Sequence, residues 1–288
     1  MAPISNLRVN ASAHSMIVND ILQNSSSAIP QPIVIIGIDG AGKTCLLQQI
    51  ADSVARSGKH ILWIDGRTVF STDDIIAHQN ITPHTVILID DIDFYFTRCS
   101  YDEQYRLRHY LYNEGAPMLI ATAEKVLPAF SEYQAPFFEG IKMVYLKPLA
   151  IDKCVANCFD PSNISRVQSL FDLLPKTIKS LEIIDAIIAT NNDSARDLQC
   201  LFTFFSSQFH AQYKALPTYS QRILNALGTN SHGLLLSEIR KKSGLGTNIL
   251  SAYLKIMFDS GVIAKDSSQK RRSTYAIKDP LFALWIGS

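Results

Sequence analysis

The sequence predicts an α/β fold: a parallel five-stranded sheet with covering helices, then an all-helical lid and a C-terminal winged helix-turn-helix. Three observations predict it. Short apolar runs alternate with helical stretches up to residue 146, which is typical of a parallel sheet buried on both faces. Strand-like runs are then missing until residue 262. After residue 216, three short helical patterns precede two strand patterns joined by a polar, basic stretch.

The composition fits a globular protein without a membrane segment. Of the 288 residues, 47% are hydrophobic and 18% charged, enough apolar side chains for a packed core. The longest apolar runs, such as residues 33–36, fall far short of the roughly 20 residues that a membrane helix needs. Residues 1–30 lack the apolar stretch of a signal peptide, and the five cysteines show no CxxC spacing. We therefore expect a cytoplasmic protein with no disulfide framework and no zinc site.

The elements follow in order along the chain. An amphipathic helix is expected at residues 11–23, and a longer helix at 42–56 follows the first strand. The five expected strands are residues 33–36, 61–65, 85–89, 118–121 and 142–146. Residues 152–216 read as helical, broken near 160 and 192. Helices ending at 228, 242 and 260 and strands at 262–264 and 274–277 complete the winged helix. The expected domains are 1–149 for the core, 150–216 for the lid and 217–288 for the winged helix.

The loop after the first strand carries the strongest motif. Residues 37–44, GIDGAGKT, fit G-x-x-x-x-G-K-[ST] in full, between a strand and a helix. Glycines let backbone N–H groups wrap around phosphates, and the helix N-terminus adds positive potential. Lys43 is expected to pair with the β- and γ-phosphates and Thr44 to bind Mg²⁺. The expected nucleotide-binding residues are Gly37, Ile38, Asp39, Gly40, Ala41, Gly42, Lys43, Thr44 and Cys45.

Polar residues at the ends of two further strands complete the predicted site. Asp90 and Asp91 follow an apolar run, and Thr122 follows another. At the carboxyl end of its strand, Asp90 would lie beside the phosphate loop and hold the metal through water. Asp91 is the candidate general base, and Thr122 would contact the γ-phosphate or the attacking water. The alternative for the two aspartates is a helix cap after a core strand, and for Thr122 a plain strand end.

With these residues, the chain resembles the AAA+/STAND-like ATPases of the archaeal-ATPase group, which are related to the replication-initiator ATPases. The resemblance rests on the phosphate loop, the strand ending at Asp90 and the sensor-1-like Thr122. Residues 175–178, PKTI, are similar to a Pro-Arg-Thr-Leu segment of the lid, which implies Lys176 in place of the sensor-2 arginine. Residues 275–285 are similar to the ending of that group's winged helix. The resemblance implies a parallel five-stranded P-loop NTPase core that takes ATP or ADP with Mg²⁺ between the core and the lid.

Two departures from the family pattern shape the expected activity. The usual acidic pair is Asp-Glu, whereas this chain has Asp90-Asp91, and no arginine lies between Thr122 and Leu146, where ring-forming relatives carry an arginine finger. Both departures favour a slow ATPase that works as a nucleotide-operated switch over a ring motor.

Charge is divided unevenly along the chain. Residues 217–288 hold ten Lys and Arg against four Asp and Glu, whereas residues 1–216 hold 17 against 22. The basic C-terminal part suggests duplex DNA as a partner, and the groups expected to contact it are Lys255, Lys265, Lys270, Arg271 and Arg272. A protein-docking module, or an ordinary solvated basic surface, is the alternative for the same residues.

Three functions stay open at this point. The first is an ATP-binding and ATP-hydrolysing switch whose nucleotide state controls a winged helix that engages DNA or a protein. The second is a non-hydrolysing, nucleotide-binding scaffold that acts through protein–protein interaction. The third is a DNA-binding regulator with a vestigial nucleotide site.

Overall fold

A computed structural model of the chain divides into two compact units. Unit 1 comprises residues 1–158 and 176–182, and unit 2 comprises residues 159–175 and 183–288. The structure describes residues 17–21, 23, 29–78, 81–149, 159–191, 193–228, 230, 233–266 and 273–288. The basic residues Lys270, Arg271 and Arg272 and most of the expected helix at 11–23 lie outside the described residues; residues 17–21 are helical. The predicted boundaries at 149/150 and 216/217 stay predictions.

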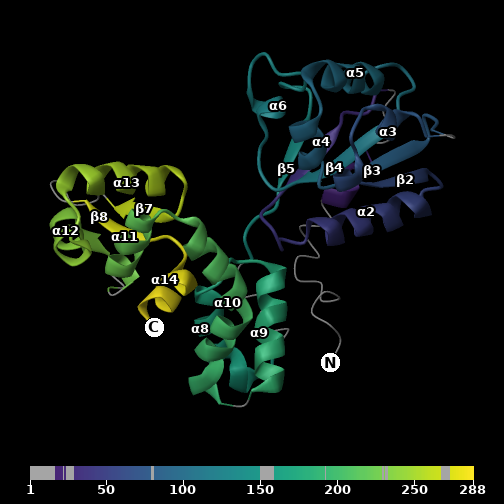
Figure 1. The fold of residues 1–288 in the computed structure, drawn as a ribbon. Coiled ribbons are helices and arrows are strands. Elements are labelled where there is room, and N and C mark those ends of the chain that lie inside the picture. Colours follow the sequence, from purple (N-terminus) through teal and green to yellow (C-terminus); the bar gives the residue numbers. More distant parts are fainter. Residues whose placement is uncertain are drawn as a thin grey trace. The chain divides into compact units, whose positions relative to one another are not determined.

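Unit 1 contains the predicted five-stranded parallel sheet (Figure 1). Its strand order is β2-β3-β4-β1-β5, and each pair of neighbours is parallel. The strands are β1 (Ile33–Ile36), β2 (His60–Asp65), β3 (Thr85–Asp90), β4 (Met118–Ala123) and β5 (Lys142–Tyr145). All five begin within a residue of the predicted positions, because strands buried on both faces need the continuous apolar runs that the sequence shows.

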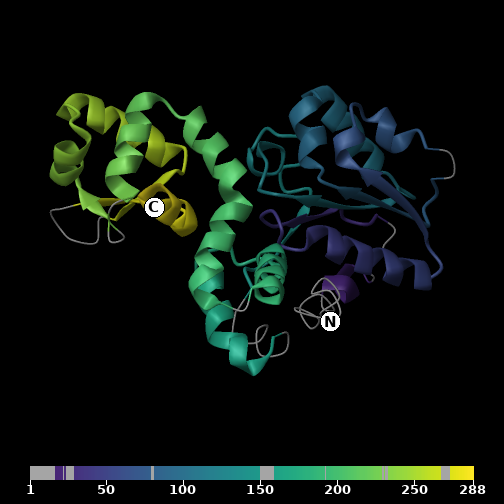
Figure 2. The same cartoon turned by 60° about the horizontal axis from the view of Figure 1, so that its bottom comes forward.

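Helices cover both faces of this sheet, α2 on one and α4 to α6 on the other (Figures 1 and 2). Alternation along each strand divides the core: Ile33 and Ile35 of β1 pack with α2, whereas Val34 and Ile36 pack in the cluster of the opposite face. The helices are α2 (Lys43–Arg56), α3 (Asp73–Ile76), α4 (Asp93–Arg98), α5 (Tyr101–Leu111) and α6 (Pro128–Ser131). The last four were expected only as helical stretches between the strands, without bounds.

The sheet order determines which loops meet. β4 lies between β1 and β3, so Thr122 stands between the phosphate loop that follows β1 and the acidic residues that end β3. Parallel strands bring their carboxyl ends to one edge of the sheet, which is where open α/β sheets place ligands.

Unit 2 contains the helices α8 (Ile164–Asp172) and α10 (Asp197–Ala215), most of α9 (Ile178–Thr190), and the elements from residue 217 onward. Within unit 2, Arg166 of α8 forms a bidentate ion pair with the buried Asp197 at the start of α10. Among the residues that the structure describes, no helix is long and apolar enough to cross a membrane.

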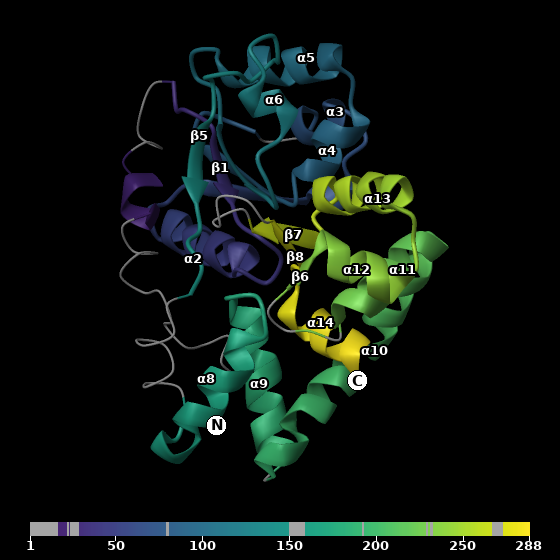
Figure 3. The ribbon, with the colours of Figure 1, turned by 90° about the vertical axis from the view of Figure 1, so that its left-hand side faces the viewer.

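The C-terminal module, residues 217–288, has the element types and order expected of a winged helix. Helices α11 (Thr218–Gly228), α12 (Leu236–Ser243) and α13 (Thr247–Asp259) accompany an antiparallel sheet of order β6-β8-β7. Its strands are β6 (Leu234–Leu235), β7 (Ile263–Asp266) and β8 (Thr274–Ile277), and α14 (Pro280–Gly287) ends the chain. Within this module α13 and α14 lie on opposite sides of α11 (Figures 1 and 3). The strand β6 and the helix α14 were not foreseen.

Candidate functional site

The loop of residues 37–42 connects β1 to α2 and depends on glycine at two positions. Gly40 and Gly42 have φ angles of 73° and 91°, in the left-handed region that side chains disfavour. A Cβ on Gly40 would lie 2.6 Å from the Cβ of Lys179, and one on Gly42 would lie 2.7 Å from Cδ1 of Ile178. Both backbone conformation and space therefore require the glycines that the motif predicts.

Lys43 lies inside this loop. Its Nζ donates to the carbonyl oxygens of Gly37, at 2.8 Å, and Ile38, at 3.3 Å. The residue is 8% exposed, so its ammonium is held by backbone dipoles instead of by water. A buried ammonium that donates to neutral carbonyls suits an incoming anion, since phosphate oxygens would bind it more strongly than carbonyl oxygens do.

Asp90 links the loop to the middle of the sheet. Its Oδ2 accepts a hydrogen bond of 2.7 Å from the Thr44 hydroxyl, and its Oδ1 accepts one of 2.5 Å from the Thr122 hydroxyl. Thr122 is fully buried and in turn accepts from the backbone N–H of Asp91, at 2.8 Å. The structure thus brings together Thr44, Asp90 and Thr122, three of the predicted site residues, in one hydrogen-bonded chain.

Asp91 follows Asp90 in a left-handed backbone conformation, with a φ of 57°. Burial, together with the neighbouring Asp90 charge, raises the pKa of its carboxyl, while Arg67 and Lys43 act in the opposite direction. A carboxyl with a raised pKa holds a proton more readily, as a general base must.

Arg67 was not foreseen by the sequence analysis. Its Nε lies 3.8 Å from Oδ2 of Asp91 and 3.0 Å from Oδ1 of Asp65. Directly before it, Gly66 packs on the acidic turn so closely that a Cβ there would lie 2.3 Å from the Asp91 carbonyl oxygen. The Gly-Arg pair directly after a predicted strand was the available signal, but only the pairing of β2 with β3 shows that it faces Asp91.

Asp93, at the start of α4, is a carboxylate that the sequence analysis did not foresee. Its Oδ2 accepts from the backbone N–H of Glu124 at 3.0 Å, whereas its Oδ1 is buried and has no hydrogen-bond partner in the described part of the chain. Burial, chiefly, raises the pKa of this carboxyl. An orphaned carboxylate oxygen at the same strand edge as Asp90 is a group that a bound cation or its water would satisfy.

Residues 176–182 belong to unit 1, and Lys179 among them contacts the phosphate loop. Its Nζ lies 2.9 Å from Oδ2 of Asp39, and this contact is the main cause of the lowered pKa of Asp39. Its backbone N–H donates to the Gly40 carbonyl at 3.3 Å. The carbonyl of Lys176 accepts from the N–H of Leu149 at 2.9 Å. The role of Lys176 toward a nucleotide stays a prediction.

The donor set fits Mg²⁺. Hard cations of this kind bind hydroxyl and carboxylate oxygens, and Thr44 and Asp90 present one of each, 2.7 Å apart. No cluster of three His, Cys, Asp or Glu side chains that could hold a metal by itself occurs among the described residues. The residues present therefore fit a cation that is shared with phosphate oxygens.

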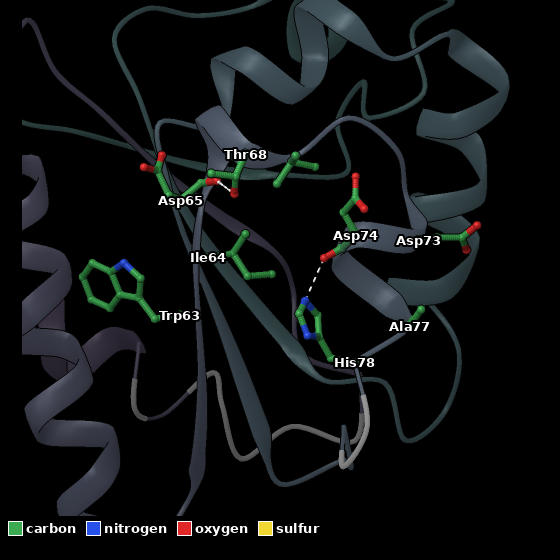
Figure 4. Close-up of a pocket in the computed structure, with 9 residues that line it drawn as sticks. Trp63, Ile64, Asp65, Thr68, Asp73, Asp74, Ala77 and His78 are labelled. Carbon is green, nitrogen blue, oxygen red and sulfur yellow. Dashed lines mark hydrogen bonds between the residues drawn. The ribbon is translucent and has the colours of Figure 1, made fainter.

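A concavity with a volume of about 460 Å³ lies at the outer edge of β2 (Figure 4). Its carboxylates are already engaged: Asp65 pairs with Arg67, Asp73 pairs with Arg106, and Asp74 accepts from the N–H groups of Phe70 and Ser71. These contacts hold the connection between β2 and α3, so we read the concavity as structural.

Comparisons with known proteins agree with this geometry. Residues 4–125, which span the phosphate loop and the acidic turn, match the family model described as Novel STAND NTPase 5. This is a P-loop NTPase fold of the AAA+/STAND type. No curated protein sequence matches the chain.

Solved structures resemble this chain over nearly its whole length. The Aeropyrum pernix Orc1 protein, solved in complex with DNA, matches with a TM-score of 0.53 and 10% identity over 97% of this chain and 92% of that one. Drosophila ORC bound to DNA matches with a TM-score of 0.50 and 11% identity over 96% and 86%. The Thermotoga maritima RuvB Holliday junction branch migration motor matches with 0.50 and 14% over 92% and 91%. At these identities the likeness shows the fold, related to that of replication initiators.

Proposed function

We propose that this protein binds ATP or ADP together with Mg²⁺ and hydrolyses ATP slowly, as a switch whose nucleotide state controls the C-terminal module. The observation that carries the proposal is the hydrogen-bonded chain of Thr44, Asp90 and Thr122 beside the enclosed ammonium of Lys43. Phosphate-binding cation, metal-binding hydroxyl and metal-side carboxylate meet at one strand edge, as phosphoryl transfer requires.

Each group has a separate role in this proposal. Lys43 exchanges the carbonyls of Gly37 and Ile38 for phosphate oxygens. Thr44 and Asp90 hold Mg²⁺, which when bound neutralises developing charge on the phosphate oxygens. Asp91 accepts a proton from the attacking water, and Thr122 fixes both aspartates, since its hydroxyl donates to Asp90 and accepts from the Asp91 N–H.

Single-turnover hydrolysis tests the proposal. Purified protein in excess over radiolabelled ATP and Mg²⁺ is expected to release phosphate at a measurable rate, and Thr44→Ala to lose most of that rate. Gln48→Ala, an exposed change one turn further along α2, is the matched control and is expected to keep it. If neither the natural protein nor the Gln48→Ala control released phosphate, the proposed hydrolysis would be contradicted.

A scaffold that holds nucleotide without hydrolysing it is the second candidate function. It is favoured by the ion pair between Arg67 and Asp91, because a carboxylate engaged by a guanidinium is a weaker base toward water. Retention of intact ATP through many hours of incubation would support this candidate and exclude the switch driven by turnover.

The partner of the C-terminal module is DNA or another protein. The DNA hypothesis rests on Lys255, which is exposed on α13, on Lys265 of β7, and on the wing residues Lys270, Arg271 and Arg272. Binding through phosphates would weaken steeply with salt, so a titration of duplex DNA at two salt concentrations tests it.

A further inference from the structure

The phosphate loop carries an acid among the residues that would surround phosphates. Asp39 stands between Ile38 and Gly40, and its side chain is 78% exposed. The hydrogen bond from Lys179 is the main cause of the lowered pKa of Asp39, and the charge of Lys43 contributes to it. The carboxylate therefore lies within electrostatic reach of the ammonium that is proposed to bind phosphate. An unpaired negative charge at this place would repel a polyphosphate.

Lys179 supplies the opposite charge, although it lies 140 residues further along the chain. Its Nζ donates to Oδ2 of Asp39 at 2.9 Å. Residues 176–182 belong to unit 1, whereas the chain on both sides of them, residues 159–175 and 183–288, belongs to unit 2. The segment that carries Lys179 is thus part of the nucleotide-binding unit by its own contacts.

The backbone of residues 177–179 is held against the loop independently of the lysine side chain. The N–H of Lys179 donates to the Gly40 carbonyl at 3.3 Å, and a Cβ on Gly40 would lie 3.2 Å from the Thr177 hydroxyl oxygen. Thr177 is 2% exposed, and its hydroxyl oxygen accepts from the N–H of Ser180 at 3.2 Å, which caps the first turn of α9. A change confined to the Lys179 side chain is therefore expected to leave the segment in place.

Two other roles for Lys179 fit less well. To bind a phosphate itself, Lys179 would have to give up a charge-assisted hydrogen bond and leave Asp39 unpaired beside the ligand. Lys43, by contrast, donates to neutral carbonyls and gives up less. A merely structural tie is the other role, but the two side chains of the pair are 59% and 78% exposed, and exposed ion pairs contribute little to folding stability.

We propose that Lys179 is a positioning residue of the nucleotide site: it neutralises Asp39, so that the loop accepts phosphates, and does not contact the phosphates itself. The proposal rests on the proposed function in that it concerns the same nucleotide site, but it needs no hydrolysis. It makes the nucleotide affinity depend on Lys179 only through Asp39.

The test is a double-mutant cycle on the full chain, with MgADP and MgATP binding measured by calorimetry at low ionic strength. Lys179→Met removes the charge and keeps the length of the side chain, and we expect the affinity for both nucleotides to fall about three- to fivefold. Lys179→Arg keeps the charge and is expected to keep the affinity. Lys179→Met combined with Asp39→Asn is expected to return to within about twofold of the natural affinity, because no acid is left to neutralise.

The matched control is Lys142→Met, which breaks another exposed ion pair of unit 1. The Nζ of Lys142 lies 3.8 Å from Oδ2 of Asp20, and the Lys142 side chain is 43% exposed. Lys142 is the first residue of β5, so it lies at the edge of the parallel sheet opposite to the phosphate loop. Lys142→Met is expected to bind both nucleotides as the natural protein does, and circular dichroism checks that all variants keep their helices.

Three outcomes would overturn the proposal. A double variant as weak as Lys179→Met would show that the lysine binds phosphate directly. Natural affinity in Lys179→Met would show that the pair with Asp39 does not influence the site. An equal loss in Lys142→Met would show that the effect is not specific to the loop.

The use of MgADP separates this proposal from the proposed function. The expected pattern of MgADP affinities in a protein that never releases phosphate from ATP would refute the switch and leave the role of Lys179 standing. Hydrolysis by a protein in which Lys179→Met binds nucleotide normally would do the reverse. Absence of MgADP binding by the natural protein would overturn the role of Lys179 together with the nucleotide site.

Discussion

At the residue scale, a single substitution of Lys43 tests whether the loop of residues 37–44 binds phosphate. Lys43→Ala removes the ammonium that the Gly37 and Ile38 carbonyls hold, and with it a charge-assisted contact worth about 1.5–3 kcal/mol toward phosphate. We expect ATP affinity to fall by about ten- to a hundredfold in calorimetry. Lys59→Ala, beyond the other end of α2, is the control; unchanged affinity in Lys43→Ala would refute the loop assignment.

Asp91 should matter for turnover and not for binding. Asp91→Asn removes the candidate base but keeps a side chain of the same shape, so single-turnover hydrolysis is expected to slow at least about tenfold while ATP affinity changes little. Equal loss of both quantities would instead make Asp91 a metal-side acid in place of Asp90.

Arg67 should tune the pH dependence of hydrolysis. The rate is expected to fall as pH drops through the pKa of Asp91, because the base must be ionised. Arg67 opposes the burial that raises this pKa, so Arg67→Ala is expected to raise it further and move the acid limb of the pH–rate profile to higher pH. Arg67→Lys keeps the charge and serves as control. An acid limb that moves to lower pH in Arg67→Ala would contradict the expectation that Arg67 lowers the pKa of Asp91.

At the scale of elements, an aromatic cluster joins α10 to α14 within unit 2. Phe209 is 2% exposed, and its ring centroid lies 5.2 Å from that of Phe282 and 5.7 Å from that of Trp285. Phe209→Ala is expected to cost about 3–5 kcal/mol of unfolding free energy, measured by urea denaturation. Phe204→Ala, on the same helix but 58% exposed, is expected to stay within about 0.5 kcal/mol. Similar costs for the two would contradict this packing.

The predicted elements agree with the structure where the pattern was long and apolar. Among the aromatic residues of α10, Phe202 and Phe209 are buried whereas Phe204 is exposed. Helical periodicity shows which residues can share a face, but the packing of α14 against α10 decides which of two apolar faces is covered.

At the scale of the whole molecule, nucleotide should stabilise unit 1. Binding to the folded state alone adds about 2.7 kcal/mol at a ligand concentration of 100 times Kd. MgATP is therefore expected to raise the midpoint of thermal unfolding by several degrees, followed by fluorescence at a fixed heating rate. EDTA should remove the part of the shift that depends on Mg²⁺, and Lys43→Ala should show a smaller shift at the same MgATP concentration, because its affinity is lower. An equal shift in Lys43→Ala would place the ligand elsewhere.

The sequence by itself determined the phosphate loop, the five strands and the acidic pair, because each leaves a local signature: glycine spacing, continuous apolar runs and carboxylates at a strand end. Tertiary structure decided what meets at the site. Because β4 lies between β1 and β3, Thr122 lies between the phosphate loop and Asp90. Because β2 pairs with β3, Arg67 lies beside Asp91. Tertiary structure also decided that Ile249 and Ile256 face water. Contacts between residues far apart in the chain follow from strand order and helix packing. Local periodicity predicts neither the strand order nor the helix packing.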